Sequence, residues 1–218
     1  GEICLSRDGK ELGVFLIDLG GGTTEISLFQ QGALMDLAVL PVGGDHITND
    51  LAVGLRTTFQ LADKLKIEHG CVLEGLASDS EEIEVEGISG KERRKISSRE
   101  LFNFIEPRVS EMLLLCSKEM TRMGFTEMPP AGVVLTGGVS LLEGIVDLSE
   151  AVFGCPVRLA QPEYLGVKSP IYSTAVGIVS YIMHNQIMGR PARRTENKTG
   201  FLDYIWQRIK AFVLDIWQ

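Results

Sequence analysis

The most constraining feature of this 218-residue chain is the segment from residue 13 to residue 29, which reads GVFLIDLGGGTTEISLF. The apolar run Val14–Leu19 predicts a buried strand, and the alternation after the glycines predicts a second strand beside it. Three consecutive glycines, Gly20, Gly21 and Gly22, separate the two strands. Because glycine has no Cβ and tolerates positive φ, backbone N–H groups at such a tip can approach an anion closely. The segment therefore predicts a β-hairpin with a phosphate-binding turn.

Three polar side chains flank this turn. Thr23 and Thr24 are expected to add hydroxyl donors beside the glycines. Asp18 can orient a hydrated Mg²⁺ ion or a water molecule next to the phosphates, and it is the candidate catalytic residue. A glycine-rich hairpin turn that holds no ligand is the alternative interpretation of this segment.

A second glycine turn favours a ligand. The apolar strand Val133–Leu135 ends in Thr136, Gly137 and Gly138, and Ser140 is predicted to begin a helix that runs to about residue 153. A glycine turn between a strand and a helix lets the backbone pass close to a flat ligand. An adenosine would lie there if its phosphates lay on the first turn, so the two turns together predict an ATP site.

Between the two turns the pattern predicts strands and short helices. A third strand is expected over residues 33–42, followed by helices over residues 45–53 and 58–67, with Gly54 ending the first. The side chains expected to point inward from these helices are Ile47, Leu51, Val53, Leu61, Leu65 and Ile67. Residues 74–96 predict a small exposed lobe with two short strands.

The second half of the chain predicts further helices and a parallel strand. Ser97 and Glu100 have the spacing of a capping box, which predicts the start of a long helix over residues 98–123 with a kink at Pro107. A strand is expected over residues 157–160 and a buried apolar helix over Ile171–Ile187. Strand, glycine turn, helix and strand in this order indicate an α/β fold with parallel neighbours.

Composition excludes several classes of function. The formal net charge of −8 argues against a sequence-wide attraction to nucleic acid. The four cysteines form no CxxC pair, which predicts reduced thiols, and the three histidines lack zinc-ligand spacing. No apolar run reaches the roughly 18 residues of a membrane-spanning helix. The chain opens Gly-Glu-Ile-Cys without an initiator methionine, which is typical of a fragment.

The C-terminal residues predict an interfacial helix. Residues 190–198 carry four basic side chains against one acidic side chain, a net of +3, and residues 201–218 form an amphipathic helix on a wheel at about 100° per residue. Its apolar arc of roughly 160° contains Phe201, Leu202, Ile205, Trp206, Ile209, Phe212, Val213, Ile216 and Trp217. This composition favours attachment to an anionic membrane surface, and packing on the body or on a partner is the alternative.

Several segments carry a family resemblance: IDLGGGTTEISLF, PVGGDHITNDLAVGLRT, KIEHG, FIEPR, GVVLTGGVSLLEGI and YSTAVGIVSY. Over essentially its whole length the chain resembles the C-terminal half of the FtsA family of actin-like bacterial cell-division proteins. The resemblance implies the second half of an actin-like, ribonuclease H-like nucleotide-binding domain with a small inserted α+β lobe and a C-terminal amphipathic helix. The glycine turns also occur in sugar kinases, Hsp70-type chaperones and other bacterial actin homologues, which remain the alternative classes.

The resemblance also implies domain boundaries. Residues 1–70 and 124–188 correspond to the second nucleotide-binding subdomain with its return helix, and residues 71–123 to the small lobe. Residues 189–200 correspond to a basic flexible linker, and residues 201–218 to a membrane-targeting helix. The family's first phosphate loop and N-terminal subdomains are expected before Gly1, so this chain would supply one wall of the site.

Residue roles follow from the same resemblance. Asp18 to Thr24 correspond to the second phosphate loop, and Gly137, Gly138 and Val139 to the adenosine loop. Asp63 and Lys66 occupy the E-x-x-K positions that flank adenosine in the superfamily, with Asp one methylene shorter than Glu. ATP and Mg²⁺ are the implied cofactors, with at most a weak ATPase activity.

The implied partners belong to bacterial cell division. The small lobe is expected to receive the C-terminal peptide of the tubulin-like protein FtsZ, with Arg99 and Arg108 as its candidate contacts. The resemblance further implies an actin-like polymer of the chain with itself, other divisome partners, and a location on the cytoplasmic side of the cell membrane at the division site. An ATP-dependent enzyme or another bacterial actin homologue is the alternative function.

Overall fold

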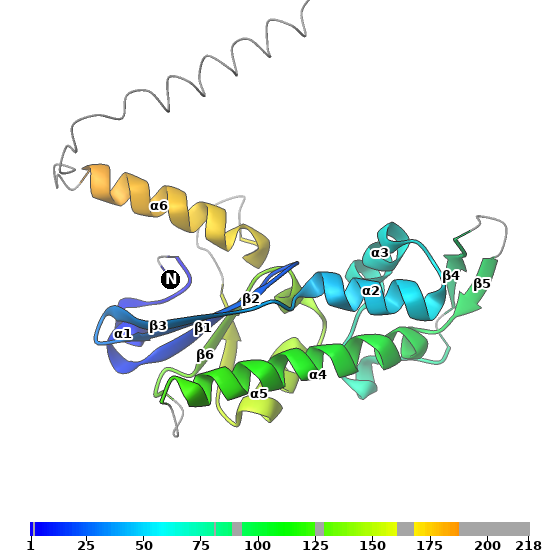
Figure 1. The fold of residues 1–218 in the computed structure, drawn as a ribbon, viewed down its shortest axis with the longest axis horizontal. Helices are drawn as coiled ribbons and strands as arrows, with labels where there is room; N and C mark the ends of the chain where they lie inside the picture. Colours follow the sequence, from blue (N-terminus) through cyan, green and yellow to red (C-terminus); the bar gives the residue numbers. More distant parts are fainter. Residues whose placement is uncertain (2, 81, 89–92, 125–128, 161–167, 188–218) are drawn as a thin grey trace, which may run out of the picture. The chain divides into compact units, whose positions relative to one another are not determined.

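The glycine hairpin lies within a five-stranded mixed sheet (Figure 1). The strands, in the order β3-β2-β1-β6-β7, are β3 (Ala33–Leu40), β2 (Thr24–Gln30), β1 (Val14–Leu19), β6 (Val133–Thr136) and β7 (Val157–Leu159). The first three are antiparallel neighbours, whereas β6 runs parallel to β1 and β7 runs parallel to β6. The parallel strands β1, β6 and β7 therefore end at the same edge, and the predicted α/β class is confirmed.

This structure is a computed structural model that describes residues 1, 3–80, 82–88, 93–124, 129–160 and 168–187. Gly1–Ser180 form one compact unit, and the second unit, Tyr181–Gln218, is described for residues 181–187. The predicted linker and membrane helix, residues 189–218, lie outside the described residues. Within the described part of the chain, no helix combines the length and apolar character needed to span a membrane.

One face of the sheet carries the main core. It packs against α2 (Gly44–Leu55), α3 (Phe59–His69), α4 (Ser98–Arg122) and α5 (Ile145–Phe153). The same cluster of buried side chains includes Ile83, Val85 and Ile96 from a two-stranded hairpin, β4 (Ile83–Glu86) and β5 (Arg93–Ile96). Strand β1 is buried on both faces, because Val14 and Leu16 belong to a second cluster on the other side with Cys4, Leu5, Val134 and Ala160. The short helix α1 (Arg7–Leu12) precedes β1.

Helix α2 begins at the tip of the hairpin and ends beside β4 (Figure 1). The prediction that Gly54 ends this helix is wrong, because the helix continues to Leu55 and is capped by Arg56, which adopts a left-handed conformation. Gly54 instead accommodates a neighbouring helix: a Cβ there would lie 2.3 Å from the ring of Phe104 in α4. Ile47 and Leu51 are buried as predicted, but Val53 is 69% exposed and Ile67 in α3 is 72% exposed.

Helix boundaries differ from prediction in the second half as well. Ser97 Oγ accepts from the Glu100 N–H at 3.2 Å, which confirms the predicted start of α4. The helix predicted from Ser140 is interrupted: a short 3₁₀ segment, Val139–Leu141, precedes α5, and Gly144 between them has φ +85°. Positive φ is unfavourable within a helix, so α5 begins only at Ile145.

Helix α6 (Ser173–Ile187) forms where a helix was predicted, after a 3₁₀ turn over Pro170–Tyr172. The prediction that it is buried is wrong for its exposed face, because Ile178 and Val179 are 57% and 56% exposed. Burial of one face suffices to hold a helix, and here Ser173 is buried while Gly177 approaches Ile3. The apolar residues around the whole of α6 therefore did not imply that every side of this helix is buried.

The four cysteines, predicted to be reduced, are free and buried. Burial raises the pKa of the Cys116 thiol to about 12, which keeps it protonated and unreactive at neutral pH. No group of three or more His, Cys, Asp or Glu side chains suited to a metal ion occurs among the residues that the structure describes.

Candidate functional site

The two glycine turns lie side by side. In the parallel pair formed by β1 and β6, Asp18 lies opposite Thr136, so both turns leave the same edge of the sheet. Gly137 has φ +89°, and a Cβ there would lie 2.4 Å from Asp18 Oδ1 and 2.5 Å from the carbonyl oxygen of Leu19. The close approach of the turns therefore requires glycine. The carboxyl ends of parallel strands are where α/β proteins bind ligands.

The hairpin turn is seated on the N-terminus of α2. The N–H groups of Gly44 and Asp45 donate to the carbonyl oxygens of Gly20 and Gly21 at 2.9 and 2.8 Å. A Cβ at Gly43 would lie 2.4 Å from the Gly21 oxygen, whereas a Cβ at Gly22 would have no heavy atom within 4 Å. The carbonyl groups of the turn thus face inward, and its tip is open beside the positive end of a helix dipole, which favours an anion.

A second contact set lies between α2 and α3. Lys66 Nζ donates to Asp63 Oδ1 at 2.7 Å, to Thr48 Oγ1 at 2.6 Å and to the Gly44 oxygen at 3.2 Å. Thr48 Oγ1 is also within 3.1 Å of Asp63 Oδ1. The hydrogen bond from Lys66 lowers the pKa of Asp63, with a smaller contribution from Thr48. Asp63 is therefore a carboxylate at neutral pH, and Lys66 an ammonium bound within the protein.

Gly44 is the point at which these parts meet. A Cβ at Gly44 would lie 2.9 Å from Val139 Cγ2, 3.5 Å from Lys66 Nζ and 3.7 Å from the Gly20 oxygen. The structure therefore brings together the hairpin turn, the 3₁₀ segment at Val139 and the end of α3, which are far apart in the sequence. Sequence reasoning assigned neither Gly43 nor Gly44 a part in the site and missed this role. The available signal was that Gly43 and Gly44 form a third cluster of glycines that follows a predicted strand.

Polar groups at the sheet edge hold Asp18. Thr174 Oγ1 donates to Asp18 Oδ2 at 3.0 Å, which connects the carboxylate to the first turn of α6. Thr24 is fully buried and donates to the Val42 oxygen at 2.8 Å, so its hydroxyl supports the turn, whereas Thr23 is exposed. Asp45 Oδ1 lies 3.5 Å from the position of a Cβ at Gly21. Sequence reasoning missed this second carboxylate because nothing in its spacing connected it to the turn.

Arg99 and Arg108 both lie on α4 but on different sides of it. Nine residues at 3.6 residues per turn place the two side chains about 180° apart. Arg99 pairs with Glu74 and Asp79, and Arg108 pairs with Asp50 and Glu111. Arg108 lines a groove of about 490 Å³ between α2 and α4, whose other lining residues are Asn49, Asp50, Val53, Gly54, Asn103, Phe104, Pro107 and Glu111.

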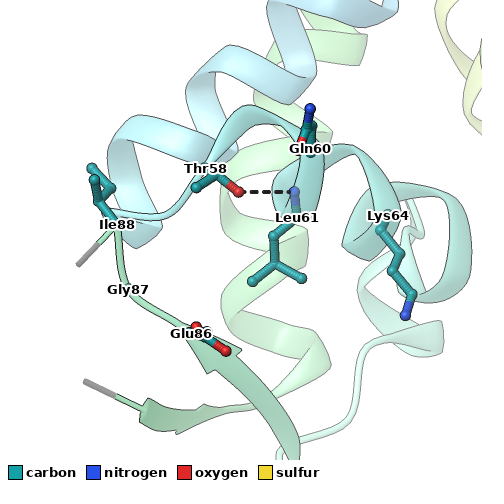
Figure 2. A pocket seen from close by; sticks show the side chains of 7 residues that line it. All are labelled: Thr58, Gln60, Leu61, Lys64, Glu86, Gly87 and Ile88. Atoms are coloured by element: carbon teal, nitrogen blue, oxygen red, sulfur yellow. Dashed lines mark hydrogen bonds between the residues drawn. The ribbon is translucent and has the colours of Figure 1, made fainter. Parts of the chain in front are cut away.

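A second cavity, of about 390 Å³, lies away from the glycine turns between the first turns of α3 and the end of β4 (Figure 2). It is lined by Thr58, Gln60, Leu61, Lys64, Glu86, Gly87 and Ile88, none of which was predicted as a site residue. The Thr58 hydroxyl accepts from the Leu61 N–H as the N-cap of α3, so it serves the helix. The predicted membrane residues from Phe201 to Trp217 lie outside the described residues.

Solved structures share this fold. MreB5 of Spiroplasma citri bound to ADP superposes with a TM-score of 0.65 at 21% identity, covering 83% of this chain and 57% of that chain. The MamK double helical filament gives a TM-score of 0.59 at 15% identity over 78% of this chain and 54% of that chain. At these identities the likeness establishes an actin-like fold, as the sequence analysis predicted.

The sequence comparisons identify the family. The family model described as "Cell division protein FtsA" matches residues 15–177. The protein named cell division protein FtsA of Pseudomonas aeruginosa is 44% identical over 190 residues, which cover 85% of this chain and 46% of that protein. The chain spans about half the length of the curated relatives it matches. This chain belongs to the FtsA family of cell division proteins.

Proposed function

We propose that this chain forms one wall of the ATP site of an actin-like adaptor that polymerises and ties FtsZ filaments to the cytoplasmic face of the membrane at the division site. The observation that carries the nucleotide site is the convergence at Gly44, where Gly20, Lys66 and Val139 all lie within 4 Å of one Cβ position. An ATP molecule needs a phosphate turn and a nucleoside surface next to each other, and the convergence at Gly44 supports the proposal because it would place the two side by side.

Each part of the site would meet a different part of ATP. The open tip at Gly21, Gly22 and Thr23 would hold phosphate oxygens through backbone and hydroxyl donors. The segment Gly137–Val139 would lie against adenosine, with Asp63 near the ribose. Asp18, held by Thr174, would orient the water shell of Mg²⁺, which neutralises phosphate charge when bound.

The division-specific part of the proposal rests on two other surfaces. The groove between α2 and α4 presents Arg108 beside the apolar side chains Val53, Phe104 and Pro107. Arg108 uses three of its five N–H donors on Asp50 and Glu111, so two remain for a carboxylate or carbonyl of the FtsZ C-terminal peptide. The sequence analysis also predicted Arg99 as a contact, but Arg99 lies on another side of α4 and does not line this groove, so the proposal rests on Arg108. Residues 201–218 would hold the polymer on anionic lipid.

Gly22→Val tests the nucleotide site. The space around Gly22 is open, so the variant should fold, while its side chain would stand where the phosphates approach. We expect isothermal titration of the 218-residue chain with Mg·ATP to show a loss of about tenfold or more in affinity, equivalent to 1.4 kcal/mol. Gly75→Val, also at an open position but in the small lobe, is the matched control and should bind like the parent. Equal affinity in Gly22→Val and the parent would contradict the placement.

A further inference from the structure

We infer that Lys66 and Thr48 are positioning residues, which hold the start of α2 and, through it, the phosphate turn. Of the three hydrogen-bonded side chains Thr48, Asp63 and Lys66, only Asp63 keeps a free acceptor oxygen for the ligand. The inference rests on the proposed nucleotide site and assigns different tasks to two residues expected to act together. It predicts that a change at Lys66, on the nucleoside side of the site, also disturbs the phosphate turn, because Gly44 is hydrogen-bonded to both.

The ammonium of Lys66 has no donor left for a ligand. A lysine ammonium carries three N–H donors and no acceptor. The three acceptors in reach are Asp63 Oδ1 at 2.7 Å, Thr48 Oγ1 at 2.6 Å and the Gly44 oxygen at 3.2 Å. The Lys66 side chain is only 12% exposed. A nucleotide that took one of these donors would have to break a charge-assisted bond inside the protein.

Thr48 lies at the centre of this cluster. It is fully buried in α2, and its hydroxyl accepts from Lys66 while its own proton can go to the Gly44 oxygen at 3.0 Å or to Asp63 Oδ1 at 3.1 Å. These bonds join the first turn of α2 to α3. Because Thr48 is buried and Lys66 is nearly so, the loss of either one would leave the other one hydrogen-bond partner short in a site with little access to water.

Gly44 transmits this anchoring to the phosphate turn. Its carbonyl oxygen accepts from Lys66, and its N–H donates to the Gly20 oxygen at 2.9 Å. The next residue, Asp45, donates in the same way to the Gly21 oxygen at 2.8 Å. If the Lys66 ammonium is removed, the start of α2 loses an anchor. The donors that hold the carbonyl groups of Gly20 and Gly21, and with them the turn that would bind the phosphates, are then less firmly fixed.

Asp63 differs from its neighbours in having a free acceptor. Oδ1 receives both Lys66 and Thr48, whereas Oδ2 has no hydrogen-bond partner within the described part of the chain. The Asp63 side chain is 41% exposed. A carboxylate oxygen is the group with which nucleotide-binding folds accept hydrogen bonds from ribose hydroxyls. Lys66 therefore orients Asp63 as well as the turn.

Inorganic tripolyphosphate can bind the phosphate turn but has no adenosine. Comparing its affinity with that of ATP therefore distinguishes a residue that positions the turn from a residue that contacts adenosine directly. In Lys66→Met we expect the affinities for ATP and for tripolyphosphate to fall by the same factor, about tenfold, because the shared phosphate turn is disturbed. In Asp63→Asn, which keeps Oδ1 for Lys66, ATP affinity should fall while tripolyphosphate affinity stays at the parent value. Weaker ATP binding with unchanged tripolyphosphate binding in Lys66→Met would overturn the inference.

A measurement without ligand tests the same inference independently. Amide hydrogen exchange of Gly44 and Asp45, followed by NMR, should accelerate about tenfold in Lys66→Met and in Thr48→Val, and remain near the parent rate in Thr48→Ser, which keeps the hydroxyl. Unchanged exchange in both disruptive variants would overturn the positioning role. If the parent bound neither ATP nor tripolyphosphate, the proposed nucleotide site would be wrong, while the exchange rates would still decide what Lys66 and Thr48 do.

Discussion

At the scale of single residues, the site depends on positions where no side chain fits. Gly43 has extended backbone, φ −164°, which any residue can adopt, so glycine is required there by contact and not by conformation. Its surroundings are the carbonyl oxygens of Gly20 and Gly21, at 2.7 and 2.4 Å from a Cβ position. Gly22, two residues after Gly20 on the same turn, has open space instead.

This contrast predicts opposite outcomes for two alanine variants. Gly43→Ala must push the hairpin turn away from α2, and we expect it to lower the free energy of unfolding by about 1–3 kcal/mol, as overpacking does elsewhere. Gly22→Ala should change it by less than about 0.5 kcal/mol. Urea denaturation of the two variants and the parent measures both values. Equal stability of all three proteins would mean that Gly43 is not in close contact with the turn.

At the scale of elements, the sequence predicted those parts of the fold whose cause is local. The hairpin followed from an apolar run and three glycines, and the start of α4 followed from Ser97 and Glu100. The errors came from contacts between distant segments. Gly54 looked like a helix stop because the approach of Phe104 cannot be read from its neighbours in sequence, and α5 starts late because Gly144 adopts positive φ.

The candidate site shows the same division. Both glycine turns were found in the sequence, and the register between Asp18 and Thr136 places them next to each other. Gly44 and Thr48 were missed, because their importance arises from tertiary contacts with α3 and with the hairpin. Sequence reasoning also grouped Arg99 with Arg108, although the helical period places them on opposite sides of α4.

The groove between α2 and α4 allows these two arginines to be separated by experiment. Arg108→Glu places a carboxylate beside Asp50 and Glu111, and we expect it to weaken binding of the FtsZ C-terminal peptide about tenfold or more, because a charged partner is replaced by a repulsive one. Fluorescence anisotropy with a labelled peptide measures the affinity.

The matched control is Arg99→Glu, which makes the same charge reversal on the same helix and also breaks ion pairs, with Glu74 and Asp79. It should bind the peptide with an affinity within about threefold of the parent, since pairs at exposed positions contribute little. Arg108→Lys keeps the charge and should lose less than Arg108→Glu. A larger loss in Arg99→Glu than in Arg108→Glu would move the peptide site to the other side of α4.

At the scale of the whole molecule, the proposal gives one chain three tasks. It would form one side of a nucleotide site, bind a peptide in the groove between α2 and α4, and attach to lipid through residues 201–218. A single interfacial helix binds membranes reversibly, because the apolar area it buries contributes only several kcal/mol. A polymer carries many such helices, and their combined binding is much firmer than that of one. Polymerisation would therefore control membrane attachment without any change in the helix itself.

The anchor can be tested with two variants that each add one negative charge to it. The helical wheel places Trp206 in the apolar arc and Gln207 on the polar side. Trp206→Glu should abolish most flotation of the 218-residue chain with liposomes that contain anionic lipid, because it removes an interfacial indole and buries a carboxylate. Gln207→Glu should reduce flotation only slightly, through repulsion from the lipid headgroups. Equal flotation of the parent and Trp206→Glu would exclude the membrane role, and an equal loss in both variants would show that net charge, and not an apolar face, holds the chain on the lipid.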